Sequence, residues 1–398
     1  MTFNKSFGLL RKRGVDLKIK KKIKLFAIFL IPFAGLFFGS FTYYNYKINH
    51  LEPGNYAGKY LLNVDTSNST EKKIDQLLSQ RFITSEGLLT SCQGVGTESD
   101  RYILLESQGQ LIEYALLVKD KNLFESVLNN LQAYFEAPKG YYYWRLNLQE
   151  KQPDNATALV DQLRVLRSLD EASTDFGEPT YKIKAFFMAF NLFRYNRYEN
   201  VFCDSYDGRI GKAEQKISLF YIDPVGLQTL SDDFPPAKQS VRRTLDILKN
   251  APRNNQGFFP SNYNLQTGSY VWPEKFTTVE QLYTIDYAQK AGMNVNTFLD
   301  FLHKSIQANG KIFSTYHADG SPDGLDDSAA VYALAARIFH QAGDNKDEQW
   351  CYERMLAYRI SDQPELQGAF GYETAKSAFA FDQMEALLTL HQEGKTIK

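Results

Sequence analysis

The most informative acidic residues of this chain lie on one expected helix, between Leu105 and Leu131. Glu106, Gln110 and Glu113 fall at positions i, i+4 and i+7, so they share one face of a helix whose other side chains are largely apolar. A carboxyl group that is partly buried in such a setting has a raised pKa, which suits it to donate a proton. Glu106 could instead be a first-turn acid that only stabilises the helix dipole, and the pattern by itself leaves both interpretations open.

This stretch resembles the S-E-G-Q-G-Y-G-M signature of glycoside hydrolase family 8. In place of the family's E-G-Q-G the chain has Glu106-Ser107-Gln108-Gly109, and its G-D-K-x-x-F element resembles Lys119-Asp120-Lys121-Asn122-Leu123-Phe124. The family uses that glutamate as the proton-donating acid, so the resemblance implies this role for Glu106. Leu105, Ser107 and Gln110 depart from the signature. Such departures indicate a divergent branch, and the branch most similar is encoded with exopolysaccharide synthesis genes in Gram-positive bacteria.

A second segment supports the resemblance. Trp144-Arg145, followed by the stretch 155–164, is similar to the family's tryptophan-basic pair and its A-T-D-G-D-L-like segment. An aspartate of that segment holds the sugar at the cleavage subsite, which implies substrate binding for Asp161. The alternative is an acid at the start of a surface helix.

The resemblance also implies a position for the second carboxylate. Val279-Glu280-Gln281-Leu282-Tyr283 lies where the family's Y-D-A-x-R segment carries the base, so Glu280 would replace an aspartate and reach one methylene further. Asp286 and Asp161 remain alternatives for the base, because the base moves between branches of this family.

A second glutamate matches part of the signature more literally. Ser85-Glu86-Gly87 spells S-E-G, but a loop-like stretch follows it. Glu106 instead opens a long helix that is followed by the D-K-x-x-F element. Glu106 is therefore the preferred acid.

Hydrolysis of a glycosidic bond needs a protonated carboxyl beside the leaving oxygen and an ionised one across the sugar. Family 8 enzymes invert the anomeric centre, which implies carboxyl groups roughly 6.5 to 9.5 Å apart with water between them. A saccharide groove also needs aromatic platforms, for which Trp144, Trp272 and Tyr221 are the candidates. The neighbouring Tyr141–Tyr143 and Phe220 could serve equally well as core packing.

Other chemistries find little support. The chain contains no phosphate loop, no G-x-G-x-x-G after a strand and no G-x-S-x-G elbow. Its five histidines and three cysteines are scattered without the spacing of metal ligands. The near-zero net charge gives no footprint for nucleic acid. We therefore predict no metal, no cofactor and no nucleic-acid partner.

Apolar residues recur with a period near 3.6 through most of the chain, which predicts an all-α fold. Gly292, Gly310 and Gly343 stand just past three helical runs, as C-terminal caps do. Paired helices without a dividing linker satisfy an (α/α)6 barrel, a toroid of six hairpins, over residues 59–398. The segments around Asp327 and Asp382 resemble late family segments that pack this barrel. The expected helices are 69–81, 106–118, 121–136, 156–171, 178–195, 232–249, 277–291, 295–308, 326–341, 345–358 and 374–393.

The N-terminal part predicts a membrane anchor. At the end of the basic tail 1–24, five lysines between Lys18 and Lys24 precede an apolar segment at 25–44, so the positive-inside rule places the N-terminus in the cytoplasm and the folded domain outside the cell. A juxtamembrane linker, 45–58, follows. A cleaved signal peptide is the alternative, although no clear cleavage site is present. No cysteine follows closely to carry a lipid.

These features together predict a membrane-anchored, extracellular glycoside hydrolase that cleaves an exopolysaccharide or biofilm matrix by inversion, with the exopolysaccharide synthesis machinery as a candidate partner. Two alternatives remain open. One is a catalytically impaired relative that binds nascent polysaccharide and assists its export. The other is a different carbohydrate-active enzyme on the same toroid, such as an epimerase or a lyase.

Overall fold

The computed structural model describes residues 69–94, 102–147, 152–372, 374 and 377–396. In this part of the chain twelve α-helices, α2 to α13, follow one another with short strands between them, which confirms the predicted largely helical fold. The predicted basic tail, apolar segment and linker lie outside the described residues. Among the helices that are described, none is long and apolar enough to span a membrane.

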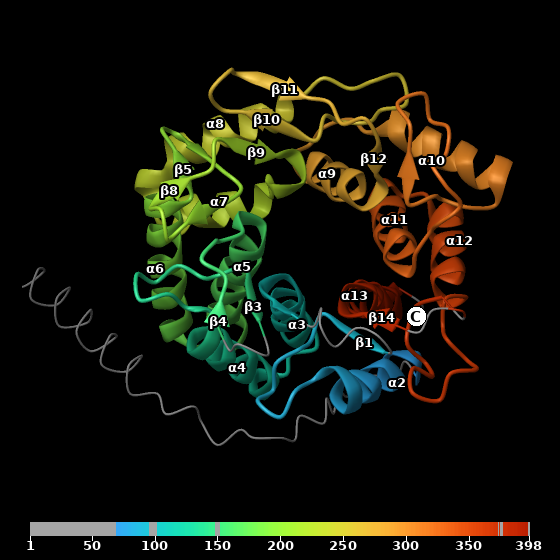
Figure 1. The fold of residues 1–398 in the computed structure, drawn as a ribbon, viewed down its shortest axis with the longest axis horizontal. Helices are drawn as coiled ribbons and strands as arrows, with labels where there is room; N and C mark the ends of the chain where they lie inside the picture. The colour runs from blue at the N-terminus through green and yellow to red at the C-terminus, as the bar shows by residue number, and fades with distance from the viewer. Residues whose placement is uncertain (1–68, 95–101, 148–151, 373, 375–376, 397–398) are drawn as a thin grey trace, which may run out of the picture. The chain divides into compact units, whose positions relative to one another are not determined.

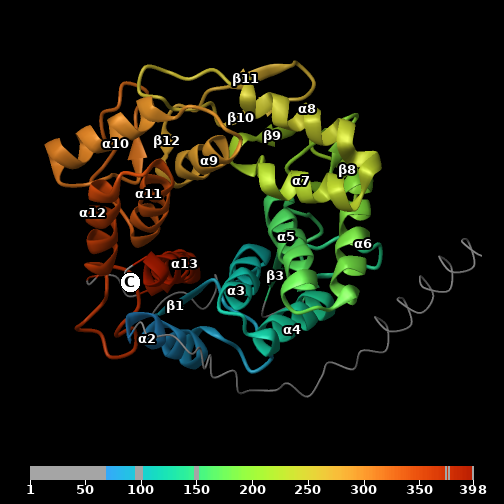
Figure 2. The same ribbon diagram turned by 180° about the vertical axis from the view of Figure 1, so that it is seen from behind.

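The helices alternate between the inside and the outside of a ring (Figure 1). Seen from behind, the odd-numbered helices again surround the centre and the even-numbered helices cover them (Figure 2). The inner helices are α3 (Leu105–Leu117), α5 (Leu159–Asp175), α7 (Pro224–Asp233), α9 (Thr278–Lys290), α11 (Ala329–Ala342) and α13 (Ala380–Thr396). The outer helices are α2 (Ser69–Leu77), α4 (Lys121–Asn130), α6 (Pro179–Tyr195), α8 (Lys238–Lys249), α10 (Asn296–Asn309) and α12 (Asn345–Leu356).

Short antiparallel strands lie in the segments that lead into the inner helices. They form the sheets β2-β3-β4, β9-β10-β11, β12-β13, β5-β6, β7-β8 and β1-β14. The β1-β14 pair joins the two ends of the folded chain, with Cys92 opposite Phe379. The strands are β1 (Cys92–Gly94), β2 (Tyr102–Leu104), β3 (Arg145–Asn147), β4 (Gln152–Pro153), β5 (Arg197–Tyr198), β6 (Val201–Phe202), β7 (Tyr206–Asp207), β8 (Lys212–Ala213), β9 (Lys216–Ser218), β10 (Asn262–Asn264), β11 (Ser269–Val271), β12 (Phe276–Thr277), β13 (Thr315–Tyr316) and β14 (Ser377–Phe379).

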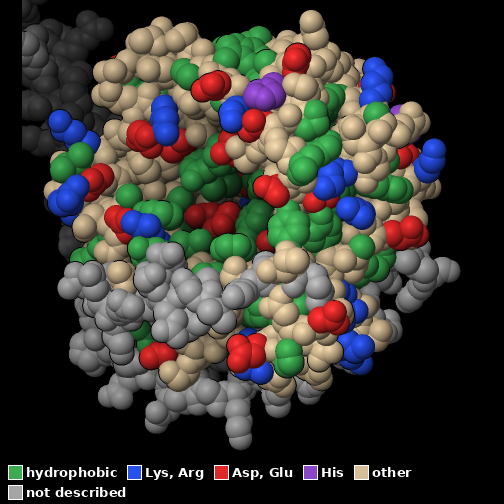
Figure 3. Space-filling view, turned by 45° about the vertical axis from the view of Figure 1, so that its right-hand side comes forward, with side chains coloured by type: hydrophobic (Ala, Val, Ile, Leu, Met, Phe, Trp, Pro, Cys, Tyr) green, Lys and Arg blue, Asp and Glu red, His purple; other side chains and the backbone are tan. Residues whose placement is uncertain are grey.

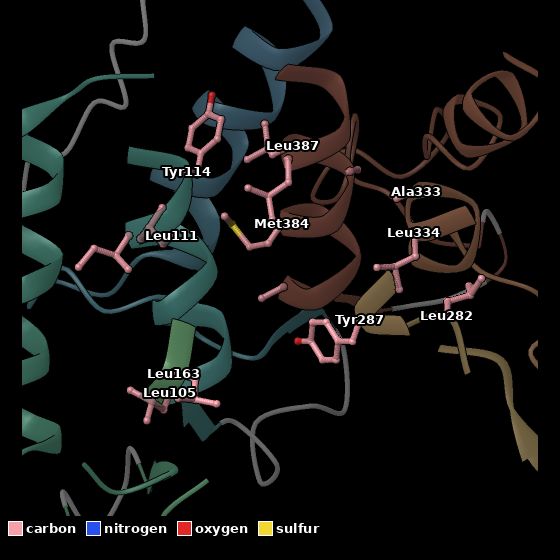
Figure 4. Close-up of a cluster of buried hydrophobic side chains, with 14 of the residues drawn as sticks. Leu105, Leu111, Tyr114, Leu163, Leu282, Tyr287, Ala333, Leu334, Met384 and Leu387 are labelled. Carbon is pink, nitrogen blue, oxygen red and sulfur yellow. The ribbon is translucent and has the colours of Figure 1, made fainter. Parts of the chain in front are cut away.

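The inner helices are buried on nearly all sides, which explains their composition. In α11 every residue from Ala329 to Ala336 is buried, as expected for a helix that is apolar around its whole circumference. Figure 4 shows apolar side chains of α3 and α13 packed together at the point where the ring closes. The core is therefore one continuous layer between the inner and outer helices.

A buried glutamine amide recurs at the same position of four inner helices. Gln108, Gln162, Gln281 and Gln383 are each the fourth residue of their helix. The Gln281 amide accepts from the Phe259 N–H at 2.8 Å and donates to the Phe259 carbonyl at 3.0 Å. Gln108 pairs in the same way with the backbone of Leu89, and Gln383 with that of Phe370.

Gln162, the fourth glutamine, and a tyrosine at the same position of α11 make variants of this interaction. Gln162 makes one such bond, from the Tyr142 N–H at 3.1 Å. In α11 the fourth residue is Tyr332, whose hydroxyl accepts from the Ile312 N–H at 3.2 Å. Each of these side chains ties an inner helix to the extended segment beside it. The first turns of these helices are thereby fixed relative to the loops at the same end of the ring.

Polar side chains also close the ring between its first and last helices. The Tyr114 hydroxyl of α3 lies 2.8 Å from Glu71 and 3.1 Å from Asp75 of α2, and His391 of α13 lies 3.0 Å from Glu71. Burial, opposed by the Tyr114 hydrogen bond, raises the pKa of Asp75 to about 8. A protonated Asp75 lets these two acids share one hydroxyl without full charge repulsion.

The predicted helices agree with the structure except in two regions. The predicted helix 374–393 begins too early, because Ser377–Phe379 form β14 and α13 begins at Ala380. The predicted helix 232–249 is wrong in its extent: the chain ends α7 at Asp233, turns through Pro235–Ala237 and restarts as α8 at Lys238. The sequence analysis missed α7 itself, whose signals were Asp223 as a capping side chain and Pro224 as the first helical residue. The three predicted glycine stops are confirmed, with φ of 75°, 62° and 75° at Gly292, Gly310 and Gly343.

We predict that Gln281→Leu destabilises the protein by roughly 2–4 kcal/mol, because a side chain of similar size leaves the buried N–H and carbonyl of Phe259 without partners. Urea unfolding of the variant and the wild type measures this difference. Gln228→Ala is the control, since Gln228 is an exposed residue of the inner helix α7 that pairs with a side chain, and we expect it to change stability very little. Equal stability of the two variants would show that the amide does not hold the loop.

Candidate functional site

Three carboxyl groups lie in the first turns of three inner helices. Glu106 is the second residue of α3, and Asp161 and Glu280 are the third residues of α5 and α9. All three line one cavity of about 180 Å3. The other described residues that line it are Leu104, Trp144, Ala158, Val160, Arg164, Phe220, Tyr221, Val279 and Tyr283.

The local sequence explains this arrangement. Each acid comes one or two residues before a glutamine that fixes its helix to the neighbouring backbone, so its side chain is presented at the same end of the ring. Acids in a first turn are also stabilised by the helix dipole. The space-filling view shows a hollow with acidic side chains in its depth and hydrophobic side chains around them (Figure 3).

Burial governs the charge of these acids. It raises the pKa of Asp161 to about 8, with Glu106 adding to the shift and Arg164 opposing it. Burial also raises the pKa of Glu106. The Arg164 cation opposes this shift, and the Glu385 carboxylate adds to it. The pKa of Glu280 is raised by burial too, and Lys216 opposes this. The site can therefore hold a protonated carboxyl near neutral pH, which is what general acid catalysis requires.

A buried polar network lies behind the cavity. Gln110, Arg164, Tyr283 and Glu385 are each the sixth residue of their inner helix. The Glu385 carboxylate accepts from the Gln110 amide and the Tyr283 hydroxyl, each at 2.6 Å, and pairs with Arg337. Although burial disfavours its charged form, Arg337 and Arg164 hold the pKa of Glu385 below its usual value.

Two of the aromatic side chains that line the cavity, Trp144 and Tyr221, are held in place by neighbouring side chains. Trp144 is held by Arg145, whose guanidinium carbon lies 4.4 Å from the Trp144 ring centre and 4.6 Å from that of Tyr102. Asp154 fixes Arg145 in turn, at 3.0 Å. Tyr221 packs edge-on against Phe220 with ring centres 4.9 Å apart. Both rings could therefore support a sugar face without reorganising.

Two further hollows continue from this cavity. The first, of about 430 Å3, shares Leu104 and Val279 with it and reaches Phe379 and Asp382. The second, of about 440 Å3, shares these last two residues with the first and extends to Tyr372. The three spaces form a groove in which the described aromatic residues Phe379 and Tyr372 are 54% and 40% exposed.

Other residues considered from the sequence lie elsewhere. Trp272 does not line the cavity in the described structure; it is 42% exposed and packs edge-on against Phe276. Asp286 pairs with Lys290 at 2.7 Å and accepts from Gln341. Glu86 lies in an exposed turn. Tyr141 belongs to a small separate cluster of packed tyrosines.

The sequence analysis did not single out Arg164, Tyr283 or Glu385, and it treated Asp382 as packing. Asp382 lines both further hollows, and burial raises its pKa to about 6. These residues could have been recognised by their position along the sequence relative to a glutamine. Asp161, Glu280 and Asp382 each precede one directly, while Arg164, Tyr283 and Glu385 follow one by two residues.

Comparisons with known proteins bear on the fold. No protein-family model matches the chain. It is 27% identical over 287 residues to a Bacillus subtilis (strain 168) protein named "Putative lipoprotein YdaJ", covering 72% of this chain and 78% of that protein.

Solved structures give higher coverage at lower identity. An alpha-amylase from Clostridium perfringens has a TM-score of 0.75 at 19% identity, covering 82% of this chain and 99% of its own. PssZ from Listeria monocytogenes has a TM-score of 0.67 at 20% identity, with coverages of 82% and 97%. The family 8 endoglucanase Cel10 from Klebsiella pneumoniae has a TM-score of 0.60 at 12% identity, with coverages of 82% and 100%. The chain therefore has the fold of family 8 glycoside hydrolases, as its sequence resemblance implied.

Proposed function

We propose that this protein is an inverting glycoside hydrolase that cleaves an extracellular polysaccharide, with Glu106 as the acid and Glu280 as the base. The observation that carries the proposal is a single cavity lined by Glu106, Asp161 and Glu280 together with the aromatic residues Trp144 and Tyr221. Carboxyl groups beside aromatic platforms are the components that glycosidic hydrolysis needs. The glycosidases among the proteins of the same fold support the general class.

The proposed reaction assigns one task to each acid. Glu106 donates its proton to the glycosidic oxygen as that bond breaks. Glu280, ionised, takes a proton from a water molecule that attacks the opposite face of the sugar. Asp161 binds the sugar at the cleavage point. Glu280 lines the cavity from α9 and Glu106 from α3, and this separation onto two helices suits a mechanism with water between the acids.

The shape of the site favours a polymer as substrate. The cavity continues into two further hollows, and exposed aromatic rings lie along them. A small sugar would leave these surfaces unused, whereas a chain would cover them. The exopolysaccharide setting rests on the sequence resemblance and on the fold that the chain shares with PssZ.

We expect Glu106→Gln to lower hydrolysis by about 10²- to 10⁴-fold, because the amide cannot donate the proton while it keeps the shape of the side chain. Release of reducing ends from polysaccharide of the same cells measures the rate, and sedimentation with that polysaccharide measures binding. Binding should persist in the variant. If wild type and variant bind equally and neither releases reducing ends, the protein is a polysaccharide-binding relative instead.

A second pair of variants tests the base. Glu280→Gln should lower the same rate by a comparable factor, whereas Asp286→Asn should leave it near the wild-type value. Asp286 is the matched control because it lies on the same helix, α9, paired with Lys290 and outside the cavity. The reverse result would move the base to Asp286. If neither variant loses activity, Asp161 becomes the candidate for the base.

Other chemistries on this fold fit the cavity less well. A sugar epimerase would use paired histidines, and none of the described residues that line the cavity is a histidine. His391, at the closure of the ring, is bonded to Glu71 instead. A hydrolase therefore fits these side chains better than an epimerase does.

We propose further that residues 25–44 anchor the protein in the cell membrane as a single span, with the N-terminus in the cytoplasm and the folded domain outside. The lysine-rich tail before the apolar segment supports this orientation. The name of the Bacillus subtilis relative also refers to membrane attachment, by a lipid. In this chain the first cysteine is Cys92, so the apolar segment is the better candidate for the anchor.

The topology can be tested on intact cells that carry an epitope tag after Lys398. External protease should remove the tag, and the protein should remain in membranes washed with carbonate. A tag that becomes sensitive only after lysis would contradict the orientation. A mature N-terminus beyond the apolar segment would instead establish a cleaved signal peptide.

A further inference from the structure

Arg164 is a buried cation on the floor of the candidate site. It lies one turn after Asp161 on α5, lines the same cavity as Glu106 and Asp161, and its side chain is only 8% exposed. The neighbouring helix makes room for it. A Cβ added at Gly109 of α3 would come within 3.2 Å of the Arg164 Cδ atom, so this glycine, one turn after Glu106, leaves space for the arginine stem.

The guanidinium is held from two sides. Its Nε atom lies 3.6 Å from Glu113, and its Nη2 atom donates to the Tyr283 hydroxyl at 3.4 Å. Glu113 is also paired with Arg167 at 3.7 Å, and Tyr283 with Glu385 at 2.6 Å. These contacts keep the guanidinium beside the two cavity acids. In the described structure it forms no ion pair with either of them.

One nitrogen of this guanidinium has no partner. The Arg164 Nη1 atom is buried and makes no hydrogen bond in the structure. A buried donor without a partner costs free energy, so each such group in a native protein needs an explanation. Here the donor belongs to a residue that lines the same cavity as Glu106 and Asp161, two carboxyls whose charged forms are disfavoured by burial.

The charges around Arg164 limit how many protons the two acids can hold. Burial favours protonation of both Glu106 and Asp161, and a neighbouring carboxylate adds to it, Glu385 for Glu106 and Glu106 for Asp161; the Arg164 cation opposes protonation in each. Two interacting carboxyls titrate as a pair, so their protons belong to the pair and not to either residue. The buried cation favours an ionised carboxyl beside it, whereas burial disfavours ionisation of both acids at once, so the state with one proton is favoured near neutral pH.

We propose that Arg164 is a positioning residue that keeps the Glu106–Asp161 pair at one proton near neutral pH, ready for transfer to the leaving oxygen. The transfer step rests on the proposed hydrolase function, whereas the proton count does not. The titratable and charged groups that face the guanidinium are Glu106, Glu113, Asp161, Arg167, Tyr221, Tyr283, Tyr287 and Glu385.

The pH dependence of unfolding tests the proton count without any substrate. A carboxyl whose pKa is raised in the folded state stabilises the protein while it is protonated, so stability falls as pH rises from the unfolded pKa towards the folded one. For Asp161 this window runs from 3.8 to about 8. Removing the cation by Arg164→Gln raises the pKa of the pair further. The decrease in stability with rising pH should then continue to a pH about one unit or more above that of the wild type.

The measurement is the unfolding temperature of the purified full chain in mild detergent, from about pH 5 to pH 9. Arg164→Lys keeps the charge and should retain the wild-type profile. Arg167→Gln is the matched control, because Arg167 is a partly buried arginine on the same helix that shares Glu113 but does not line the cavity. Arg167→Gln should lower the unfolding temperature, but it should change the dependence of that temperature on pH less than Arg164→Gln does. Identical profiles for Arg164→Gln and Arg167→Gln would overturn the proposal.

A double variant guards against loss of folding. The double variant Arg164→Gln with Asp161→Asn removes one carboxyl together with the cation. Glu106 is then the only acid of the pair that remains without the positive charge. The double variant should be more stable than Arg164→Gln alone and should lose the extended fall. If both unfold equally, Arg164 is only a packing residue and the proposal fails.

An activity profile separates this inference from the proposed function. If the wild type releases reducing ends, Arg164→Gln should move the alkaline limb of kcat/KM to higher pH, because the pair keeps its proton longer. An unmoved limb would contradict the role of Arg164 in the reaction. If the wild type releases none, the hydrolase proposal fails, while the unfolding profiles still decide whether Arg164 sets the proton count.

Discussion

The candidate site depends on one repeated interaction, a glutamine amide that binds the backbone of an extended segment from the first turn of an inner helix. At three of the four positions the amide accepts from the N–H and donates to the carbonyl of the same residue. These bonds are buried, so water cannot replace them at low cost. They fix the rotation of these four inner helices about their own axes. That rotation decides which side chains face the cavity and which face the centre of the ring.

The consequences appear on either side of each glutamine. The residues just before it lie at the end of the ring and supply Glu106, Asp161, Glu280 and Asp382. The residue two positions after it lies deeper and supplies Gln110, Arg164, Tyr283 and Glu385, which form the polar network below the cavity. A polar network inside an apolar ring is costly unless its members are paired. Among the described side chains at these four positions, one buried donor has no partner, the Arg164 Nη1 atom. One buried acceptor also has none, the side-chain carbonyl oxygen of Gln110.

Much of the fold could be predicted from the sequence, because apolar periodicity reports helices directly. The short helix α7 escaped because its apolar pattern is brief and joins that of α8, and only Asp223 and Pro224 mark its start. Glu106, Asp161, Glu280, Trp144 and Tyr221 line one cavity, as a shared site requires, whereas Trp272 lies outside it. Their catalytic and binding roles remain proposals.

The rest of the site could not be predicted, and the reason is geometrical. The glutamine pattern has no fixed spacing along the chain, since the segments between inner helices differ in length. Without the helix starts, Gln162 and Gln281 look like ordinary polar residues. Arg164 was equally invisible, because its partners Glu113 and Tyr283 come from two other helices. Only the ring brings these side chains together.

The departures from the family signature can now be judged by where they point. Leu105 is fully buried in the core, and Gln110 is bonded to Glu385 in the buried polar network. Ser107 is buried and borders the adjacent hollow. None of the three is among the described residues that line the cavity of Glu106. The changes therefore alter how α3 packs and leave its carboxyl beside a cation and a second acid. Since none of the three lines the cavity, these departures from the signature do not by themselves argue against the catalytic role proposed for Glu106.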